Sequence, residues 1–112
     1  MDILWVQKQD GTLEPLHPFC FYDFLEDIPE LKRYQVVQTS PKSLWIYLVP
    51  LDGKRAQSLR VGVDKELRAM LEQKGLLEEV SYNLEIVQEI PREQKSLKFK
   101  PIVSLGYATG PL

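Results

Sequence analysis

The chain has 112 residues, of which 44% are hydrophobic and 27% charged, and its 14 basic and 16 acidic side chains give a formal net charge of -2. This length suits a single domain over residues 1–112, and the apolar content excludes a natively disordered chain. The small negative charge argues against nucleic acid or an anionic membrane as a partner held by electrostatics alone.

The composition also indicates a cellular setting. The one cysteine, Cys20, cannot form an intrachain disulfide, and no cysteine or histidine spacing matches a structural zinc site. No window approaches the ~20 apolar residues that span a bilayer. The first ten residues lack the basic and apolar regions of a signal peptide. We therefore expect a cytoplasmic domain without a metal site and without membrane contact.

The first third of the chain predicts a hairpin followed by a helix. Residues 3–6 and 12–16 read as short strands joined by a turn at Asp10-Gly11. Residues 18–28 place apolar side chains at i, i+4 and i+7, which is typical of a helix with one buried face. Pro29 predicts the end of this helix, because the residue before a proline avoids the helical region.

The middle of the chain predicts two neighbouring strands. Residues 34–39 and 43–49 are separated by a turn, and 43–49 is apolar almost without interruption, as a strand inside a sheet would be. We expect residues 55–62 to form the extended lead into a second helix.

That second helix is predicted over residues 65–74. Asp64 is placed to be its N-cap and Gly75 its C-cap. Strands over 82–90 and 102–105 follow. Residues 12–90 therefore have the order βαββαβ, which predicts an α+β, ferredoxin-like fold: an antiparallel sheet with two helices on one face, plus an N-terminal hairpin strand and a short C-terminal extension.

Positive charge is concentrated in residues 92–100 (REQKSLKFK). Four basic residues oppose Glu93 there, for a local charge of +3. Such a segment suits an anionic partner, because lysine and arginine donate to phosphate or carboxylate. The alternative is an ordinary solvated charge run. The basic residues are Arg92, Lys95, Lys98 and Lys100.

Four other features could carry chemistry but have a plainer structural interpretation. His17 has no identifiable nucleophile or carboxylate to act with. Cys20 lies among aromatic residues, where a thiol packs as a small hydrophobe. Clustered carboxylates at 23, 26, 27 and 30 lack a ligand loop and read as a solvated helix face. Aromatic side chains at 5, 45 and 47 could stack bases, but the basic and glycine pattern of an RNA-binding strand is missing.

Four segments follow one another in a recognisable order. They are DILWV at the start, LHPFCFYDFLEDIPELKRYQVVQ, VDKELRAMLEQKGL and EIPREQKSLKFKPIVS, and together they reach from Asp2 to Ser104. Their order and spacing resemble the C-terminal lid domain of adenylate-forming enzymes, in particular the phenylacetate–CoA ligase-like branch. In that family, the lid closes over a large domain that makes an acyl-adenylate, and then rotates for thioester formation.

The resemblance implies specific roles for residues of the basic segment. A lysine near the end of the family's lid bridges the substrate carboxylate and the α-phosphate, and SLKFK places Lys98 in that position. Lys95 is the alternative if the loop register differs, since Leu97 stands where the family usually has glycine. Lys100 and Arg92 are the implied substrate-binding residues, and Asp2 falls on the hinge motif.

The resemblance also implies the ligands and partners. ATP with Mg and CoA would bind to the large N-terminal adenylation domain, in cis or in trans, and none to this chain alone. Because the chain has no nucleotide-binding core of its own, we expect it to form no acyl-adenylate by itself. The alternative is a non-catalytic ferredoxin-like module that forms a homodimer or senses a small ligand.

Overall fold

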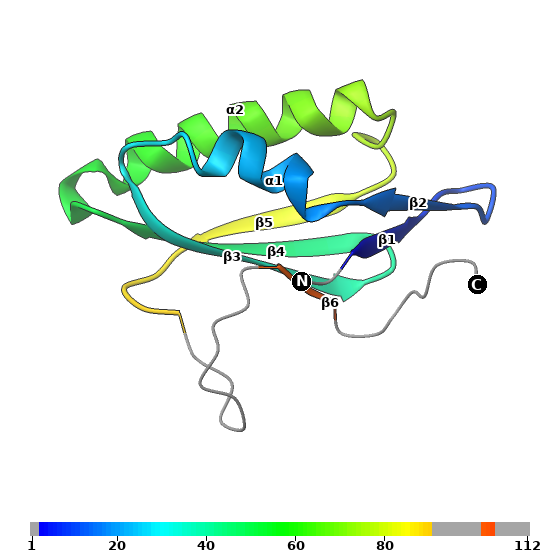
Figure 1. The fold of residues 1–112 in the computed structure, drawn as a ribbon, viewed down its shortest axis with the longest axis horizontal. Coiled ribbons are helices and arrows are strands. Elements are labelled where there is room, and N and C mark those ends of the chain that lie inside the picture. The colour runs from blue at the N-terminus through cyan, green and yellow to red at the C-terminus, as the bar shows by residue number, and fades with distance from the viewer. Residues whose placement is uncertain (1–2, 91–101, 105–112) are drawn as a thin grey trace.

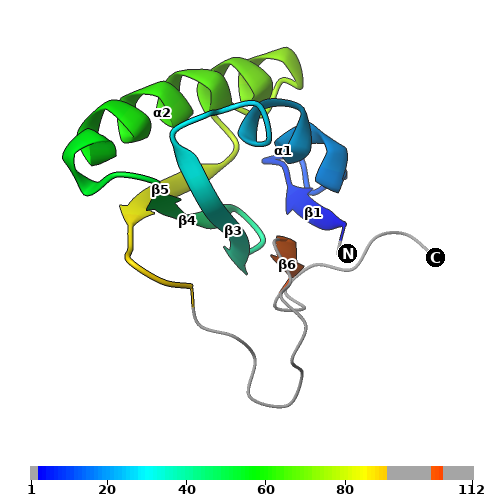
Figure 2. The same ribbon diagram turned by 60° about the vertical axis from the view of Figure 1, so that its left-hand side comes forward.

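The computed structural model describes residues 3–90 and 102–104. The strands form a four-stranded sheet in the order β5-β4-β3-β6 and a separate β1-β2 hairpin. Both helices cover the same face of the larger sheet (Figures 1 and 2). The predicted α+β class is confirmed and is compatible with a ferredoxin-like fold. The elements are β1 (Leu4–Gln7), β2 (Leu13–Leu16), α1 (Pro18–Leu25), β3 (Leu31–Ser40), β4 (Ser43–Pro50), the 3-10 turn η1 (Gly53–Arg55), α2 (Ala56–Gln73), β5 (Ser81–Ile86) and β6 (Ile102–Ser104).

The hairpin forms where the sequence predicts it. Gly11 has φ of 87°, a left-handed value that glycine adopts without strain. The Asp10 carboxylate accepts hydrogen bonds from the Thr12 hydroxyl at 2.6 Å and the Thr12 N–H at 2.9 Å. These hydrogen bonds lower the pKa of Asp10, because they stabilise its charged form. The hairpin then adds Leu4, Val6 and Leu16 to the buried core.

Helix α1 is shorter than predicted and ends at Leu25 rather than at residue 28. Pro29 has no N–H to donate to the carbonyl of Leu25, and its ring would clash with that carbonyl in a continued helix. The N–H of Ile28 donates to the Leu25 oxygen instead, at 3.3 Å, in a tighter turn. Ile28 still packs against the core, but from this turn and not from the helix.

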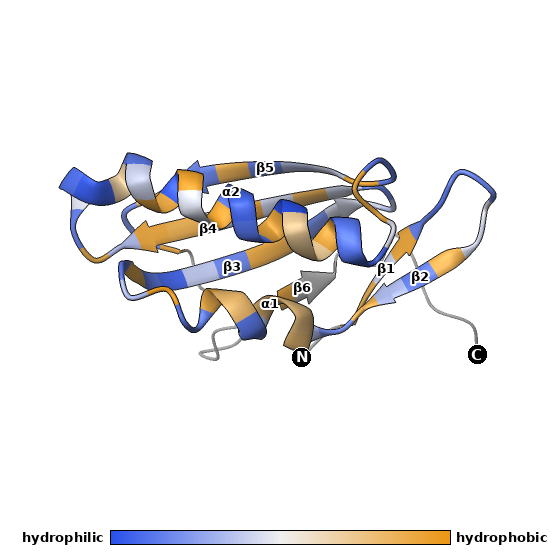
Figure 3. Ribbon diagram, turned by 90° about the horizontal axis from the view of Figure 1, so that it is seen from above, coloured by the Kyte–Doolittle hydropathy of each residue, from blue (hydrophilic) through white to orange (hydrophobic). Residues whose placement is uncertain are grey.

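Strands β3 and β4 are the antiparallel centre of the sheet. Their register places Tyr34 opposite Leu48 and Val36 opposite Ile46. The side chains alternate along both strands, so that one face is buried beneath the helices while the other stays half-exposed. Figure 3 shows that both hydrophobic and polar residues occur along these strands.

Helix α2 begins eight residues before the predicted Asp64 cap, and the extended segment expected over residues 55–62 is wrong. Its buried stripe consists of Leu59, Val63, Leu67 and Leu71, which recur every four residues and pack on the sheet. Asp52 accepts from the N–H of Lys54 at 3.0 Å and caps η1, which leads into the helix. At the other end, Lys74 is the C-cap residue, and Gly75, which the sequence nominates as the cap, follows it with φ of 70°.

The strand pairing is mixed rather than wholly antiparallel. The α2 crossover makes β5 parallel to β4, and β6 is parallel to β3. Among the described strands, β2 pairs with β1 alone. Pro15, which has no N–H, lies opposite Trp5 in the hairpin. A strand with a central proline fits a sheet edge and not the interior of a larger sheet, which is why β2 stays in the hairpin.

Candidate functional site

The site residues that the sequence nominates lie outside the described residues. These are Asp2, Arg92, Lys95, Lys98 and Lys100. The nearest described residues on either side of the basic segment are Ile90 and Ile102. Ile90 is 5% exposed and Ile102 is fully buried, so both ends of the segment are anchored in the protein.

The topology determines where the basic segment is attached. Strand β5 is parallel to β4, β4 is antiparallel to β3, and β3 is parallel to β6. The end of β5 and the start of β6 therefore lie at the same end of the sheet. This is also the end at which β3 starts and β4 finishes. The described chain therefore ends before residues 91–101, and resumes after them, on strands that share one end of the sheet.

A surface hollow of about 330 Å³ lies at that end of the sheet, and Pro29, Glu30, Leu51, Asp52 and Arg55 line it. Arg55 forms an ion pair with Glu30 across 3.7 Å, and both side chains are partly exposed. Leu51 is 64% exposed beside them. The hollow combines an apolar side chain with charges of both signs. This combination suits contact with another protein surface better than capture of a small anion.

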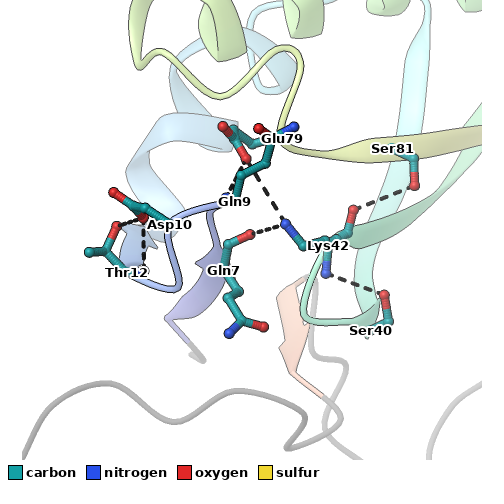
Figure 4. Close-up of polar contacts among 8 residues, drawn as sticks. All are labelled: Gln7, Gln9, Asp10, Thr12, Ser40, Lys42, Glu79 and Ser81. Carbon is teal, nitrogen blue, oxygen red and sulfur yellow. Dashed lines mark hydrogen bonds and ion pairs between the residues drawn. The ribbon is translucent and has the colours of Figure 1, made fainter.

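The opposite end of the sheet holds the hairpin in place through a group that we name the Lys42 cluster: Gln7, Gln9, Lys42 and Glu79 (Figure 4). The Lys42 ammonium donates to the main-chain oxygen of Gln7 at 3.0 Å and lies 4.0 Å from the Glu79 carboxylate. The same carboxylate accepts from the Gln9 N–H at 2.8 Å. The cluster thus joins the hairpin, the β3–β4 turn and the connection before β5.

The aromatic side chains at 5, 45 and 47, which the sequence disfavours as a base-stacking platform, come together only in part. Trp45 and Tyr47 are two residues apart on β4, so both side chains lie on the helix-free face of the sheet. Their ring centroids are 6.3 Å apart. Trp5 belongs to the hairpin sheet. The indole N–H of Trp45 donates to the Glu85 carboxylate at 2.8 Å, which puts a negative charge beside the rings. A carboxylate here repels phosphate, so the arrangement does not favour nucleic acid.

Two of the four carboxylates on and after α1 have structural partners. Glu26 accepts from the Tyr34 hydroxyl at 2.8 Å, and Glu30 pairs with Arg55. Burial raises the pKa of Tyr34 above its ordinary value, and the hydrogen bond to Glu26 raises it further. Within residues 3–90 and 102–104, no group of three histidine, cysteine or acidic side chains is arranged to hold a metal ion.

His17 and Cys20 both belong to the start of α1. His17 is the N-cap residue, with an extended backbone and no side-chain hydrogen bond to the helix. Cys20 is half-buried and packs against the hydrophobic core. The placement of Cys20 agrees with the structural role that the sequence indicates for it.

A groove between α2 and β5 was missed by the sequence analysis. Its central contact is the Tyr82 hydroxyl, which donates to Asp64 at 2.6 Å. Burial raises the pKa of Tyr82, and the bond to Asp64 adds to that shift. Two adjoining hollows of about 320 and 570 Å³ share these two residues. The leucine and valine stripe of residues 59–71 could have revealed the groove, because it extends the helix back past Asp64. The other lining residues include Gln57, Arg60, Val61, Arg68 and Asn83.

Comparison with known proteins finds no match to a family model, to a curated protein or to a solved structure. Neither helix in the described part of the chain combines the length and hydrophobicity that crossing a bilayer requires.

Proposed function

We propose that this chain is the lid domain of an adenylate-forming enzyme, of the acyl–CoA ligase-like kind, and works in the cytoplasm. It acts on the active site of a large adenylation domain, joined to it or separate, where ATP, Mg and CoA bind. The chain lends that site a lysine and performs no reaction alone. The proposal rests on the order of the four sequence segments that resemble the family.

The way those segments fall on the fold supports the proposal. The ILWV part of the first segment covers β1, and the second segment contains all of α1 and runs into β3. VDKELRAMLEQKGL lies in the second half of α2 and its cap, and PIVS ends in β6. The first three segments thus overlap regular elements, and the described end of the fourth segment lies in β6.

The attachment of the basic segment gives Lys98 a physical route to its role. Ile90 and Ile102 anchor the segment at one end of the sheet, and the hollow lined by Leu51 and Arg55 lies at the same end. That end is the surface we assign to the large domain. A lysine delivered there stabilises the charge that shifts between carboxylate and α-phosphate, and it does so only when the lid is closed.

The test is a reconstitution with the adenylation domain that is encoded with this chain, in the same or a neighbouring reading frame. Pyrophosphate exchange and thioester formation are measured separately. We expect Lys98→Ala to reduce adenylation by about 10²- to 10³-fold, the usual effect of removing one transition-state donor. Lys95→Ala is the matched control, and it should retain the wild-type rate.

Three outcomes would count against parts of the proposal. Loss on Lys95→Ala, with full activity in Lys98→Ala, would move the role to the alternative lysine. Wild-type adenylation in both variants would contradict the lysine assignment altogether. Pyrophosphate exchange by the isolated chain, above the background of a heat-denatured sample, would contradict the assignment as a lid.

A further inference from the structure

Strand β5 forms one edge of the four-stranded sheet, and no described element lies beyond it (Figure 3). It pairs with β4 over six consecutive residues without a register shift. Exposed edges in natural proteins are protected by proline, lysine, bulges or very short strands. Ser81–Ile86 has no proline, lysine or bulge, and its one charged side chain, Glu85, is bonded to Trp45 of β4, so the outer backbone groups are available for another strand.

The ladder determines which backbone groups face outward. The N–H of Ser81 donates to the main-chain oxygen of Lys42, and the N–H of Val87 donates to the main-chain oxygen of Leu48, both at 2.9 Å. Because successive residues of a strand point their backbone groups to opposite sides, residues 83 and 85 also face β4. Residues 82, 84 and 86 therefore direct their N–H and C=O groups away from the sheet.

We propose that a second copy of this chain pairs its β5 antiparallel to the first, about a two-fold axis at Leu84. In this register, Leu84 exchanges both hydrogen bonds with the second copy's Leu84. Tyr82 does the same with the second copy's Ile86, so every outward backbone group finds a partner. The two sheets become one continuous sheet with both α2 helices on the same face.

The side chains of β5 are complementary in the same register. On the helix-free face, Asn83 comes opposite the second copy's Glu85, where an amide meets a carboxylate and no like charges face each other. On the helix side, the half-buried Tyr82 and Ile86 become neighbours. Val61, which is 60% exposed beside the α2–β5 groove, supplies an apolar surface for the second copy to cover.

Charge substitutions at Asn83 test this register. Asn83→Glu places a carboxylate opposite Glu85 of the second copy, and Asn83→Lys places an ammonium there. Sedimentation of the full chain over a range of concentrations at low salt gives the dimer dissociation constant. We expect Asn83→Glu to raise this constant and Asn83→Lys to lower it, each by about 2- to 30-fold, since the contact occurs twice. The same substitutions at the exposed Gln73, which ends α2, should leave it unchanged.

Amide hydrogen exchange provides a second measurement that is independent of the substitutions. Dilution should dissociate the dimer and speed the exchange of the amides of Tyr82, Leu84 and Ile86. The amides of Asn83 and Glu85 should stay protected by their hydrogen bonds to β4. A monomer at every concentration would overturn the proposal and leave this edge to a strand of another protein. A dimer whose dissociation constant responds equally to both charges at Asn83, or whose β5 amides do not alternate, would also overturn it.

Discussion

The amide nitrogen of Gln38 donates to the main-chain oxygen of Trp5 at 2.7 Å, across the boundary between the four-stranded sheet and the hairpin. Gln38 is fully buried, and it is the one polar side chain among the buried residues that the structure describes. Its hydrogen bond complements the solvent-facing Lys42 cluster on the same boundary. The hairpin is therefore held by one buried and one exposed set of polar contacts.

Replacing Gln38 by methionine should lower the free energy of unfolding by about 1–3 kcal/mol, because the Trp5 oxygen loses its donor inside the protein. Methionine has nearly the same volume, so little of this loss comes from a cavity. Denaturant unfolding measures the change. Gln57→Met, at an exposed position of α2, is the control and should stay within about 0.5 kcal/mol of wild type. Equal stability of the two variants would show that the Gln38 contact contributes nothing.

Gly62→Ala should stabilise the protein by about 0.5–1 kcal/mol, because alanine is the better helix former and Gly62 lies inside α2. A Cβ atom added there meets nothing within 4 Å. Thermal unfolding would detect the change as a higher Tm. The prediction also tests the position of the helix start, since a helix beginning at Asp64 would gain nothing from alanine at residue 62.

Gly75→Ala is the contrasting variant and should destabilise by about 1 kcal/mol. Its Cβ would also have open space, but the backbone φ of 70° is unfavourable for an alanine. The two substitutions thus change the same atoms and differ only in backbone conformation. A shift of Tm in the same direction for both would contradict the assignment of Gly75 as the left-handed residue that follows the C-cap of α2.

The contribution of Tyr34 to the free energy of unfolding should decrease in alkaline solution. Its pKa is raised in the folded state, so the folded chain holds the phenolic proton to a higher pH than the unfolded chain, which releases it near pH 10.0. The stabilisation is complete below pH 10 and is lost as the pH rises above that value. The difference in unfolding free energy between wild type and Tyr34→Phe should therefore narrow in this range.

Denaturant unfolding at a series of alkaline pH values measures that difference. Glu26→Gln serves as a control because glutamine keeps an oxygen that accepts from the Tyr34 hydroxyl. It should cost less than Tyr34→Phe at neutral pH. A gap between wild type and Tyr34→Phe that stays constant from neutral to strongly alkaline solution would rule out the titration of Tyr34 as the cause.

Local features of the fold were predictable from the sequence. The Asp10-Gly11 turn, the end of the second helix at Gly75 and the two strands around residues 34–49 involve residues close together in the chain, and the structure confirms all of them. The start of α2 was not predictable in the same way. Residues 55–62 include glycine and exposed Val61, which weaken the helical pattern, although Leu59 belongs to the buried stripe.

The same distinction between local and long-range features applies to the candidate site. The lysines of residues 92–100 could be named from the sequence, because the segments that resemble the lid family are read in order along the chain. Their structural setting could not, since the shared end of β5 and β6 results from strand directions across the whole sheet. The Tyr82–Asp64 contact likewise joins residues 18 positions apart that only the packing of α2 on β5 brings together.

The sequence by itself determined the class of fold, the order of its elements and the two glycines, Gly11 and Gly75, at which the chain turns. These depend on backbone preferences and on the spacing of apolar side chains, both of which act over a few residues. Only the tertiary structure decided which strands pair, that β2 remains in the hairpin and that β5 is left at an edge. Strand pairing depends on hydrogen bonds between distant segments, and their energy depends on which partners the packed core brings within reach.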